Sequence, residues 1–317
     1  MLYTAKAILK KNPVLRSGII KTINSFYTLI YYISPRLFTQ MLYKRVLGSS
    51  LNLTNPRHFN EKIQWLKLNW RHPLVVQCGD KYTVRAYVES CGYKDILPEL
   101  YGVFEHSHDV DFRTFPDRFA LKCTHGCGFN IICRDKKVLD QRETVKQLSK
   151  WMKQKYGVNA GEIHYDKMMP RIICESYLDD GTGLLPIDYK IFCFHGKPLL
   201  IMTCTDRALH TQYNYYDFKW NKVHLTKDDA FNRDLERPIS LEKMYEIAEA
   251  LAQPFPFVRI DLYEIKGEVV FGEMTFTPAG GMDRDYTDEA SLHLGSLIQL
   301  PRVYYDNVQH DKVNSSA

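Results

Sequence analysis

The chain has 317 residues, 45% hydrophobic and 25% charged, without repeats or low-complexity tracts, and can bury a sizeable core in one large or two to three smaller domains. Its eight cysteines include no CxxC pair and no zinc-type spacing, so we predict reduced thiols in a cytosolic protein rather than disulfides or a zinc site. The net charge of +5 is uneven, because residues 1–60 carry nine Lys or Arg and no Asp or Glu, and the remainder carries 33 basic and 37 acidic residues.

Residues 1–50 are predicted to form a basic helical extension. Asn12-Pro13 is typical of a helix start, and apolar residues then recur at helical spacing, at Leu15, Ile19, Ile23, Phe26, Ile30 and Ile33. The longest uncharged run, residues 22–35, has 14 residues, whereas a membrane span needs about 20. No small-residue cleavage site follows an apolar core, so a secretory signal is not predicted.

This extension has two open interpretations. It is either an interfacial helix on an anionic membrane, at the inner face of the plasma membrane, or a helix whose apolar stripe packs on the body of the protein. Nucleic acid is not predicted as a partner, because the basic residues are not interleaved with stacking side chains.

Two helices are predicted in residues 51–118, the N-terminal part of the body. They span residues 59–70, which follow a linker-like segment, and residues 80–89. Lys81 falls in the first turn of the second helix, where the helix dipole disfavours a cation. A lysine in that place is expected to face an anion or solvent.

Residues 119–134 predict a strand, a glycine loop and a second strand. Lys122 ends the first strand, and Gly126 and Gly128 let the following loop approach a ligand closely. Successive amides in such a loop form a concavity for anions, and His125 within it is a candidate donor to a phosphate or substrate oxygen. The loop is not a Walker A motif, because no GK[ST] follows, and a structural turn is the alternative interpretation.

Two further strands are predicted around residues 172–178 and 188–196. Glu175 lies near the end of the first strand, where a carboxylate can accept hydrogen bonds from a ribose or an amino group. Asp188 and Lys190 share one face of the second strand. The alternatives are a loop residue for Glu175 and a plain cross-strand pair for Asp188 and Lys190.

The segment with the clearest pattern is a hairpin of two strands, residues 257–265 and 268–276, around the turn signal Lys266-Gly267. A three-residue loop, residues 266–268, would place Asp261 opposite Glu273 and Arg259 opposite Thr275. Opposed carboxylates repel unless a cation lies between them, and Mg²⁺ suits such oxygen ligands. The alternative is a solvent-facing hairpin in which Asp261 pairs with Arg259 or a lysine.

Taken in order, these segments resemble the TupA-like ATP-grasp family, over about residues 55–300. The matching segments are FNEKIQWLKLN, GDKYTVRAYV, LKCTHGCGFNII, DYKIFCFHG, FPFVRIDLY and FGEMTFTPAGG. The resemblance implies an α+β ATP-grasp fold in which two subdomains, residues 119–180 and 181–301, sandwich ATP. Residues 302–317 are then expected to be a flexible tail.

The resemblance also implies a role for each matching residue. Lys81 and Lys122 would contact the phosphates of ATP, and the loop from Gly126 through Gly128 to Asn130 would close over them. The adenosine moiety would be held by Glu175, the backbone of Tyr177 and Leu178, and Asp188 with Lys190 beside it. Arg259 would stabilise the transferred phosphate, and Mg²⁺ would be bound by Asp261, Glu273 and Thr275. With Arg259, we predict Lys122 and the loop residue His125 as the catalytic residues. Many ATP-grasp ligases carry Asn where this chain has Thr275, a poorer neutral ligand.

The function that the resemblance implies is an ATP-dependent carboxylate–amine ligase acting through an acyl phosphate. The family is associated with surface-polysaccharide assembly, so the expected partners are an amino acid and a uronic-acid-containing glycan or lipid-linked oligosaccharide. Such an enzyme is expected in the cytoplasm or at the inner membrane face. The alternatives are a kinase acting on a sugar hydroxyl and a non-catalytic scaffold that binds nucleotide or glycan.

Overall fold

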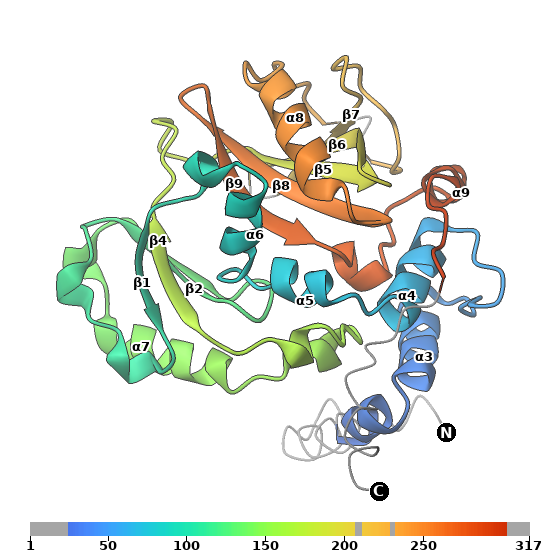
Figure 1. The fold of residues 1–317 in the computed structure, drawn as a ribbon, viewed down its shortest axis with the longest axis horizontal. Helices are drawn as coiled ribbons and strands as arrows, with labels where there is room; N and C mark the ends of the chain where they lie inside the picture. The colour runs from blue at the N-terminus through green and yellow to red at the C-terminus, as the bar shows by residue number, and fades with distance from the viewer. Residues whose placement is uncertain (1–24, 207–210, 229–231, 303–317) are drawn as a thin grey trace, which may run out of the picture.

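The computed structural model describes residues 25–206, 211–228 and 232–302 and shows a mixed α+β protein with two antiparallel sheets (Figure 1). This confirms the predicted fold class. The first half of the predicted N-terminal helix and the predicted tail from residue 303 onward lie outside the described residues. The subdomain boundaries proposed from the sequence stay a prediction.

The first sheet has the strand order β1-β4-β2-β3, with bounds Leu100–Phe104, Ile172–Ser176, Phe119–Cys123 and Asn130–Cys133. Because side chains alternate along a strand, Leu121 and Cys123 on β2 point to one face, where Leu148 of helix α7 (Gln141–Met152) covers them. Lys122, between them, points to the opposite face. Glu175 on β4 lies beside it on that face, and the two side chains form an ion pair there.

The second sheet has the order β7-β6-β5-β8-β9, with bounds Gln212–Tyr216, Lys197–Thr205, Asp188–Phe194, Phe257–Ile265 and Glu268–Thr275. Helix α8 (Leu241–Ala252) covers the face that carries Ile191 and Ile260. The other face is apolar at one end, where Phe192 and Phe257 pack under α4 (Phe59–Asn69) and α9 (Asp288–Ser296). Charged side chains occupy the other end of that face.

Three helices follow one another in the chain between residues 59 and 90. Helix α4 confirms the predicted helix at residues 59–70, and Pro73 opens the short α5 (Pro73–Gly79), which the sequence analysis missed. Helix α6 runs from Val84 to Ser90, shorter than the predicted 80–89, because the carboxylate of Asp80 accepts the backbone N–H groups of Tyr82 and Thr83. Lys81 therefore lies in a turn before the helix. Figure 1 shows α5 and α6 between the two sheets.

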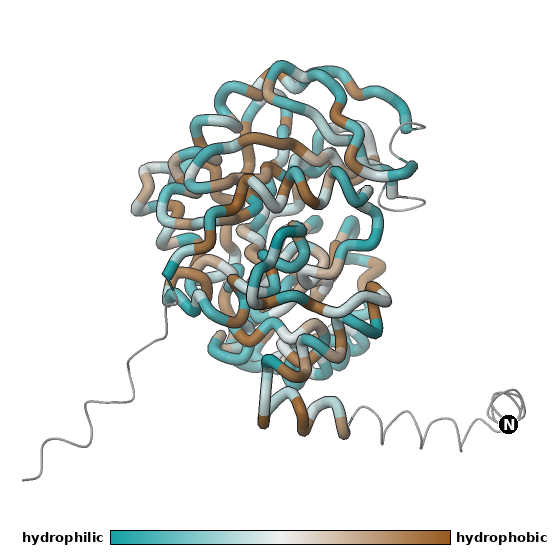
Figure 2. The backbone as a smooth tube through the Cα atoms, turned by 90° about the vertical axis from the view of Figure 1, so that its right-hand side faces the viewer, coloured by the Kyte–Doolittle hydropathy of each residue, from teal (hydrophilic) through white to brown (hydrophobic). Residues whose placement is uncertain are grey.

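The chain before α4 lies along one side of the body. Residues 25–33 are helical and lead into α3 (Pro35–Leu47), which Ser34 caps (Figure 2, lower edge). Tyr31 holds this segment to the body, because its ring packs on Phe38 and its hydroxyl donates to Asp166 at 2.6 Å. Of the predicted apolar stripe, Phe26 and Ile33 are exposed and Ile30 is half-buried.

The hairpin of β8 and β9 has the predicted register at its functional end. Asp261 lies opposite Glu273, and Arg259 lies opposite Thr275. The predicted three-residue loop is wrong, because Ile265 pairs with Glu268 and the turn is Lys266-Gly267, both with positive φ. A β-bulge after Asp261 adds the missing residue to β9, at Gly272.

Gly272 should tolerate no side chain, because a Cβ there would lie 2.8 Å from the backbone oxygen of Asp261. We expect Gly272→Ala to destabilise the fold by about 1–3 kcal/mol, since Glu273 would shift relative to Asp261. Chemical denaturation measures the effect. The matched control is Gly267→Asn, because asparagine tolerates the positive φ of the turn. Equal behaviour of the two variants would contradict this role of the bulge.

Candidate active site

The charged end of the second sheet is a connected network of ion pairs around Asp261. Both oxygens of this buried carboxylate, which is 1% exposed, accept from Arg259, through Nε and Nη2 at 2.7 Å each. Lys190 Nζ also lies 2.5 Å from Asp261 Oδ2 and 2.6 Å from Asp188 Oδ2. Asp261 thus pairs with Arg259 and a lysine, as one interpretation expected, but in a buried rather than solvent-facing hairpin.

Glu273 extends this network toward α6. Its Oε2 lies 3.3 Å from Lys81 Nζ, and its Oε1 accepts from the hydroxyl of Thr275 at 3.3 Å. Burial alone would raise the pKa of Glu273, but the charges of Lys81, Lys190 and Arg259 outweigh it and lower the pKa to about 2. Glu273 is therefore a carboxylate at neutral pH. We call these six residues the hairpin network: Lys81, Asp188, Lys190, Arg259, Asp261 and Glu273.

Lys81 connects the hairpin network to the first sheet. Its Nζ donates to the carbonyl oxygen of Gly126 at 2.8 Å, and its backbone N–H donates to Thr124. Both acceptors belong to the segment that links β2 and β3. The ammonium group of Lys81 thus contacts both the glycine loop and the carboxylate hairpin, which are far apart in the sequence.

A second group of charges, the β4 network, lies on the first sheet. Glu175, buried on β4, accepts from Lys122 Nζ at 2.7 Å and from Arg85 Nη1 at 3.0 Å. Glu175 is an internal strand residue, rather than the loop residue of the alternative interpretation. The sequence analysis missed Arg85, which lies on α6 four residues after Lys81. The sequence offers no local signal for it, because Lys81 lies in the turn before α6 and Arg85 meets Glu175 through tertiary packing.

The glycine loop has a different requirement at each glycine. Gly128 has a φ of 75°, which favours glycine, whereas a Cβ at Gly126 would lie 2.8 Å from the rings of Phe129 and Tyr156. Asn130 is exposed at the start of β3, opposite Lys122. Cys127, between the glycines, is exposed, whereas six of the eight cysteines are buried.

His125 is not part of either network. The structure places its ring in the core behind the loop, 5.7 Å from the ring of Phe129, with Nε2 3.2 Å from the carbonyl oxygen of Trp151. Burial lowers the pKa of His125, so the ring is neutral at pH 7. This position gives His125 a packing role, in contrast to the predicted contact with a phosphate or substrate.

The predicted adenine residues follow β4. Tyr177 and Leu178 are half-buried in the segment that leads from the first sheet to the second. The guanidinium of Arg118 lies over the Tyr177 ring at 4.7 Å and pairs with Asp179 at 2.6 Å. The ring of Tyr177 is thereby oriented beside the strand that carries Glu175.

The two networks contain hard oxygen ligands and the cations that phosphate oxygens attract. Asp261 and Glu273 fit Mg²⁺, which proteins often bind through one or two carboxylates while phosphates supply other ligands. Among the residues that the structure describes, no group of three or more His, Cys, Asp or Glu side chains forms a metal site. The hydroxyl of Thr275 hydrogen-bonds to Glu273 and Arg259, so it orients the carboxylate in this structure.

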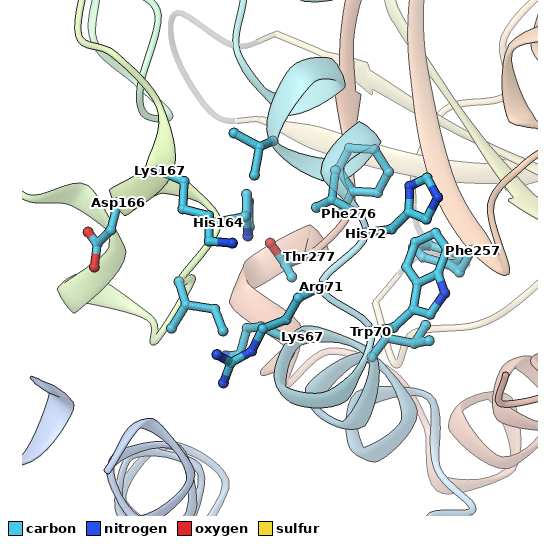
Figure 3. A pocket seen from close by; sticks show the side chains of 14 residues that line it. Lys67, Trp70, Arg71, His72, His164, Asp166, Lys167, Phe257, Phe276 and Thr277 are labelled. Carbon is cyan, nitrogen blue, oxygen red and sulfur yellow. The ribbon is translucent and has the colours of Figure 1, made fainter. Parts of the chain in front are cut away.

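A cavity of about 250 Å³, which we call the α4 cavity, lies next to the end of β9 (Figure 3). It is bounded by the end of α4 and by residues 163–167, and Thr277, two residues beyond Thr275, reaches it. Lys67 lines it as a buried amine that donates to the carbonyl oxygen of Ala160 at 2.6 Å. Burial lowers the pKa of Lys67 to about 8, partly offset by the carboxylate of Glu162.

Lys67 should make stability depend on pH in the alkaline range. The folded protein binds fewer protons than the unfolded chain between about pH 8 and the ordinary lysine pKa of 10.5, so this residue's contribution to the free energy of unfolding rises with pH there. We expect the free energy of unfolding of the wild type, minus that of Lys67→Met, to become more positive from pH 8 to pH 10, as measured by urea denaturation. A constant difference across this range would contradict the lowered pKa.

Residues 61–299 match the family described as TupA-like ATPgrasp, which is more than half of the chain. A comparison with curated proteins finds no significant match.

Solved structures with a similar arrangement include three ligases or synthetases. D-alanine–D-alanine ligase from Bacillus anthracis with ATP has a TM-score of 0.44 and 15% identity, covering 70% of this chain and 65% of that one, so this chain spans slightly less than two thirds of its length. The Helicobacter pylori D-alanine–D-alanine ligase has a TM-score of 0.43 and 14% identity, covering 78% of this chain and 68% of that one. D-cycloserine synthetase DcsG has a TM-score of 0.41 and 13% identity, covering 84% of this chain and 94% of that one. Likenesses at this level carry no argument about activity.

Proposed function

Because the chain belongs to the TupA-like ATP-grasp family, we propose that it is an ATP-dependent carboxylate–amine ligase that acts through an acyl phosphate. The observation that carries the proposal is that five cations and four carboxylates form one ion-pair network on each sheet, and that Lys81 of the hairpin network also holds the glycine loop of the first sheet. The cations are Lys81, Arg85, Lys122, Lys190 and Arg259, and the carboxylates are Glu175, Asp188, Asp261 and Glu273.

The reaction needs charge neutralisation and positioning more than covalent chemistry from the protein. A carboxylate is a poor acyl donor, since its leaving group would be oxide. Transfer of the γ-phosphoryl group from ATP to the carboxylate oxygen releases ADP, and attack by an amine then forms the amide and releases phosphate. The phosphoryl group carries negative charge throughout, so a site rich in fixed cations stabilises its transfer.

In this proposal the ammonium and guanidinium groups exchange partners when ATP binds. Lys122 and Arg85 leave Glu175 free to accept from the nucleoside, and Lys81 turns from Glu273 to the phosphates. Arg259 lies beside the carboxylates and supports the transferred phosphoryl group. Asp261 and Glu273 would hold Mg²⁺, which neutralises phosphate charge. The phosphates replace Glu273 as the partner of Lys81, whereas the buried carboxylate of Glu175 exchanges two ion pairs for hydrogen bonds from the nucleoside.

The glycine loop is the element that we propose closes over the phosphates. Its amides and the adjacent Lys122 suit an anion, and Gly126 and Gly128 permit a close approach of the backbone. Exclusion of water matters in this chemistry, because an acyl phosphate is readily hydrolysed.

The acceptor that we propose is a uronic acid of a surface polysaccharide or its lipid-linked precursor, and the amine is an amino acid. The test is release of ADP and phosphate from Mg²⁺–ATP with a panel of uronic-acid glycans, each with and without a mixture of amino acids. We expect both products, in equal amounts and dependent on the amine. ADP without phosphate, together with a phosphorylated glycan, would identify a kinase and overturn the proposal.

A lipid-linked acceptor would lie at a membrane, and we propose that the N-terminal segment meets an anionic bilayer there. No described helix combines the length and apolar character needed to cross a bilayer. Exposed apolar side chains nevertheless line residues 25–33 and the start of α3, at Phe26, Leu29, Tyr32, Ile33 and Leu37. Arg36, Lys44 and Arg45 are exposed on the same segment, and residues 1–60 carry no acidic residue.

Vesicle sedimentation with the full chain tests this surface. We expect binding to vesicles of phosphatidylglycerol and phosphatidylcholine, weaker binding to phosphatidylcholine alone, and a loss of at least tenfold for Leu29→Glu combined with Ile33→Glu. Val138→Glu, at an exposed apolar residue elsewhere, is the matched control. Equal binding by the double variant and the wild type, or no binding to anionic vesicles, would refute the membrane contact.

A further inference from the structure

The α4 cavity carries a surplus of positive charge. Lys67, Arg71 and Lys167 line it, and Asp166 is the acidic residue among the lining side chains. Asp166 already accepts a hydrogen bond from the hydroxyl of Tyr31 at 2.6 Å. Burial and the nearby ammonium of Lys67 lower the pKa of His164, another lining residue, to about 3, so its ring adds no charge at neutral pH. The carboxylate of Glu162 lies near Lys67, so Arg71 and Lys167 are the cations of the lining that an anion would meet.

The opposite wall of the cavity is aromatic. The rings of Trp70 and His72 lie parallel, with centroids 5.2 Å apart and planes inclined by 15°, and Phe257 and Phe276 complete this wall. Figure 3 shows these four rings on one side of the cavity and Lys167, His164 and Asp166 on the other. Flat apolar faces suit the C–H face of a sugar ring, while the cations suit its carboxylate.

The size and the position of the cavity narrow the ligand further. About 250 Å³ is below the usual range of about 300–1,000 Å³ for sites that bury a drug-sized ligand, so one sugar unit fits better than a longer glycan segment. Thr277 borders the cavity and donates to Glu162 at 2.5 Å, and it continues the alternation of Glu273 and Thr275 beyond the end of β9. The cavity thus lies beside the hairpin that carries the proposed metal ligands.

We propose that the α4 cavity binds one carboxylated sugar unit of the acceptor, with its carboxylate toward Arg71 and Lys167 and its ring face toward Trp70. This inference rests on the proposed function for the identity of the acceptor. None of the residues that line the cavity belongs to the two charged networks. Its occupation can therefore be measured without nucleotide.

Binding of D-glucuronate to the full chain, measured by isothermal titration calorimetry without ATP, tests the cavity, with D-glucose as the neutral analogue. We expect glucuronate to bind at least tenfold more tightly than glucose, and Arg71→Met and Lys167→Met each to weaken glucuronate binding by about tenfold. Lys167 is exposed, so its replacement should leave folding intact. The control is Arg113→Met, an arginine on the surface whose partner is Asp111.

Three results would overturn the inference: no binding of glucuronate, equal binding of glucuronate and glucose, or unchanged binding in both cavity variants. The outcome is separable from that of the proposed function. Amine-dependent turnover with an unchanged KM for the glycan in Arg71→Met would reject the cavity and retain the ligase. Glucuronate binding that requires Arg71, without amine-dependent turnover, would retain the cavity and reject the ligase.

Discussion

Replacing Glu273 by glutamine should lower ATP turnover by roughly 10²–10³-fold, the range typical for removal of one charge-stabilising group from an active site. Glutamine has nearly the same shape and can still hydrogen-bond to Thr275, but it removes a negative charge that is present at neutral pH, since the pKa of Glu273 is about 2. The loss should therefore fall on the proposed Mg²⁺ site rather than on the strand. Nucleotide binding measured across a range of Mg²⁺ concentrations checks this, with a weaker dependence on Mg²⁺ expected in the variant.

Glu268→Gln supplies the control for this experiment. Glu268 is exposed at the first position of the same strand, so the substitution changes the net charge equally and leaves the hairpin network untouched. We expect nucleotide binding and turnover like those of the wild type. If Glu273→Gln also bound Mg²⁺–ATP and turned it over at the wild-type rate, the assignment of Glu273 would be wrong.

Replacing Arg259 by methionine should destabilise the protein by about 3–5 kcal/mol, the usual cost of removing one partner from a buried ion pair. Arg259 is 9% exposed and makes two hydrogen bonds to Asp261, whose carboxylate would then rely on Lys190 alone. The same variant should lose phosphoryl transfer, because the guanidinium that it lacks lies between Asp261 and Glu273, the two proposed metal ligands. Urea denaturation and the ADP-release assay measure the two effects separately.

The comparison is with Arg113→Met, because Arg113 also pairs with an aspartate two residues away in the sequence. The pair of Arg113 and Asp111 lies at the surface, where ion pairs contribute about 0–1 kcal/mol, so this variant should be nearly as stable as the wild type. A similar loss in both variants would show that burial of Asp261 does not determine the effect.

The sequence predicts those parts of the fold that depend on neighbouring residues. The strands around the glycine loop and the carboxylate hairpin follow from alternation and from Lys266-Gly267, and the register of Asp261 and Glu273 is confirmed. That register is correct for a different reason from the one expected, because a two-residue turn and the bulge at Gly272 together equal one three-residue loop. The alternation of side chains along the two strands does not predict the position of this bulge.

The parts that the sequence does not predict depend on contacts between distant segments. Arg85 joins Glu175 across 90 residues, and the ammonium of Lys81 meets Glu273 across a still larger separation. Likewise, His125 follows a strand lysine in a glycine loop, yet its ring packs toward Trp151 of α7, a helix that the hairpin pattern does not reveal. Local spacing identifies which residues can meet a phosphate, whereas tertiary packing decides which of them turn toward it.

The exposed thiol between the two glycines offers a direct reporter for the loop. The side chain of Cys127 is exposed. Lys81, which holds the loop through Gly126, lies close enough to influence the ionisation of this thiol. The pKa of Cys127 is raised, in part by desolvation and in part by the charge of Glu273, so labelling needs an alkaline pH. Because six of the other cysteines are buried, a thiol-directed fluorophore would reach the loop of the unmodified protein more readily than those thiols. Nucleotide that closed the loop would slow this labelling and provide a time-resolved signal without an engineered cysteine.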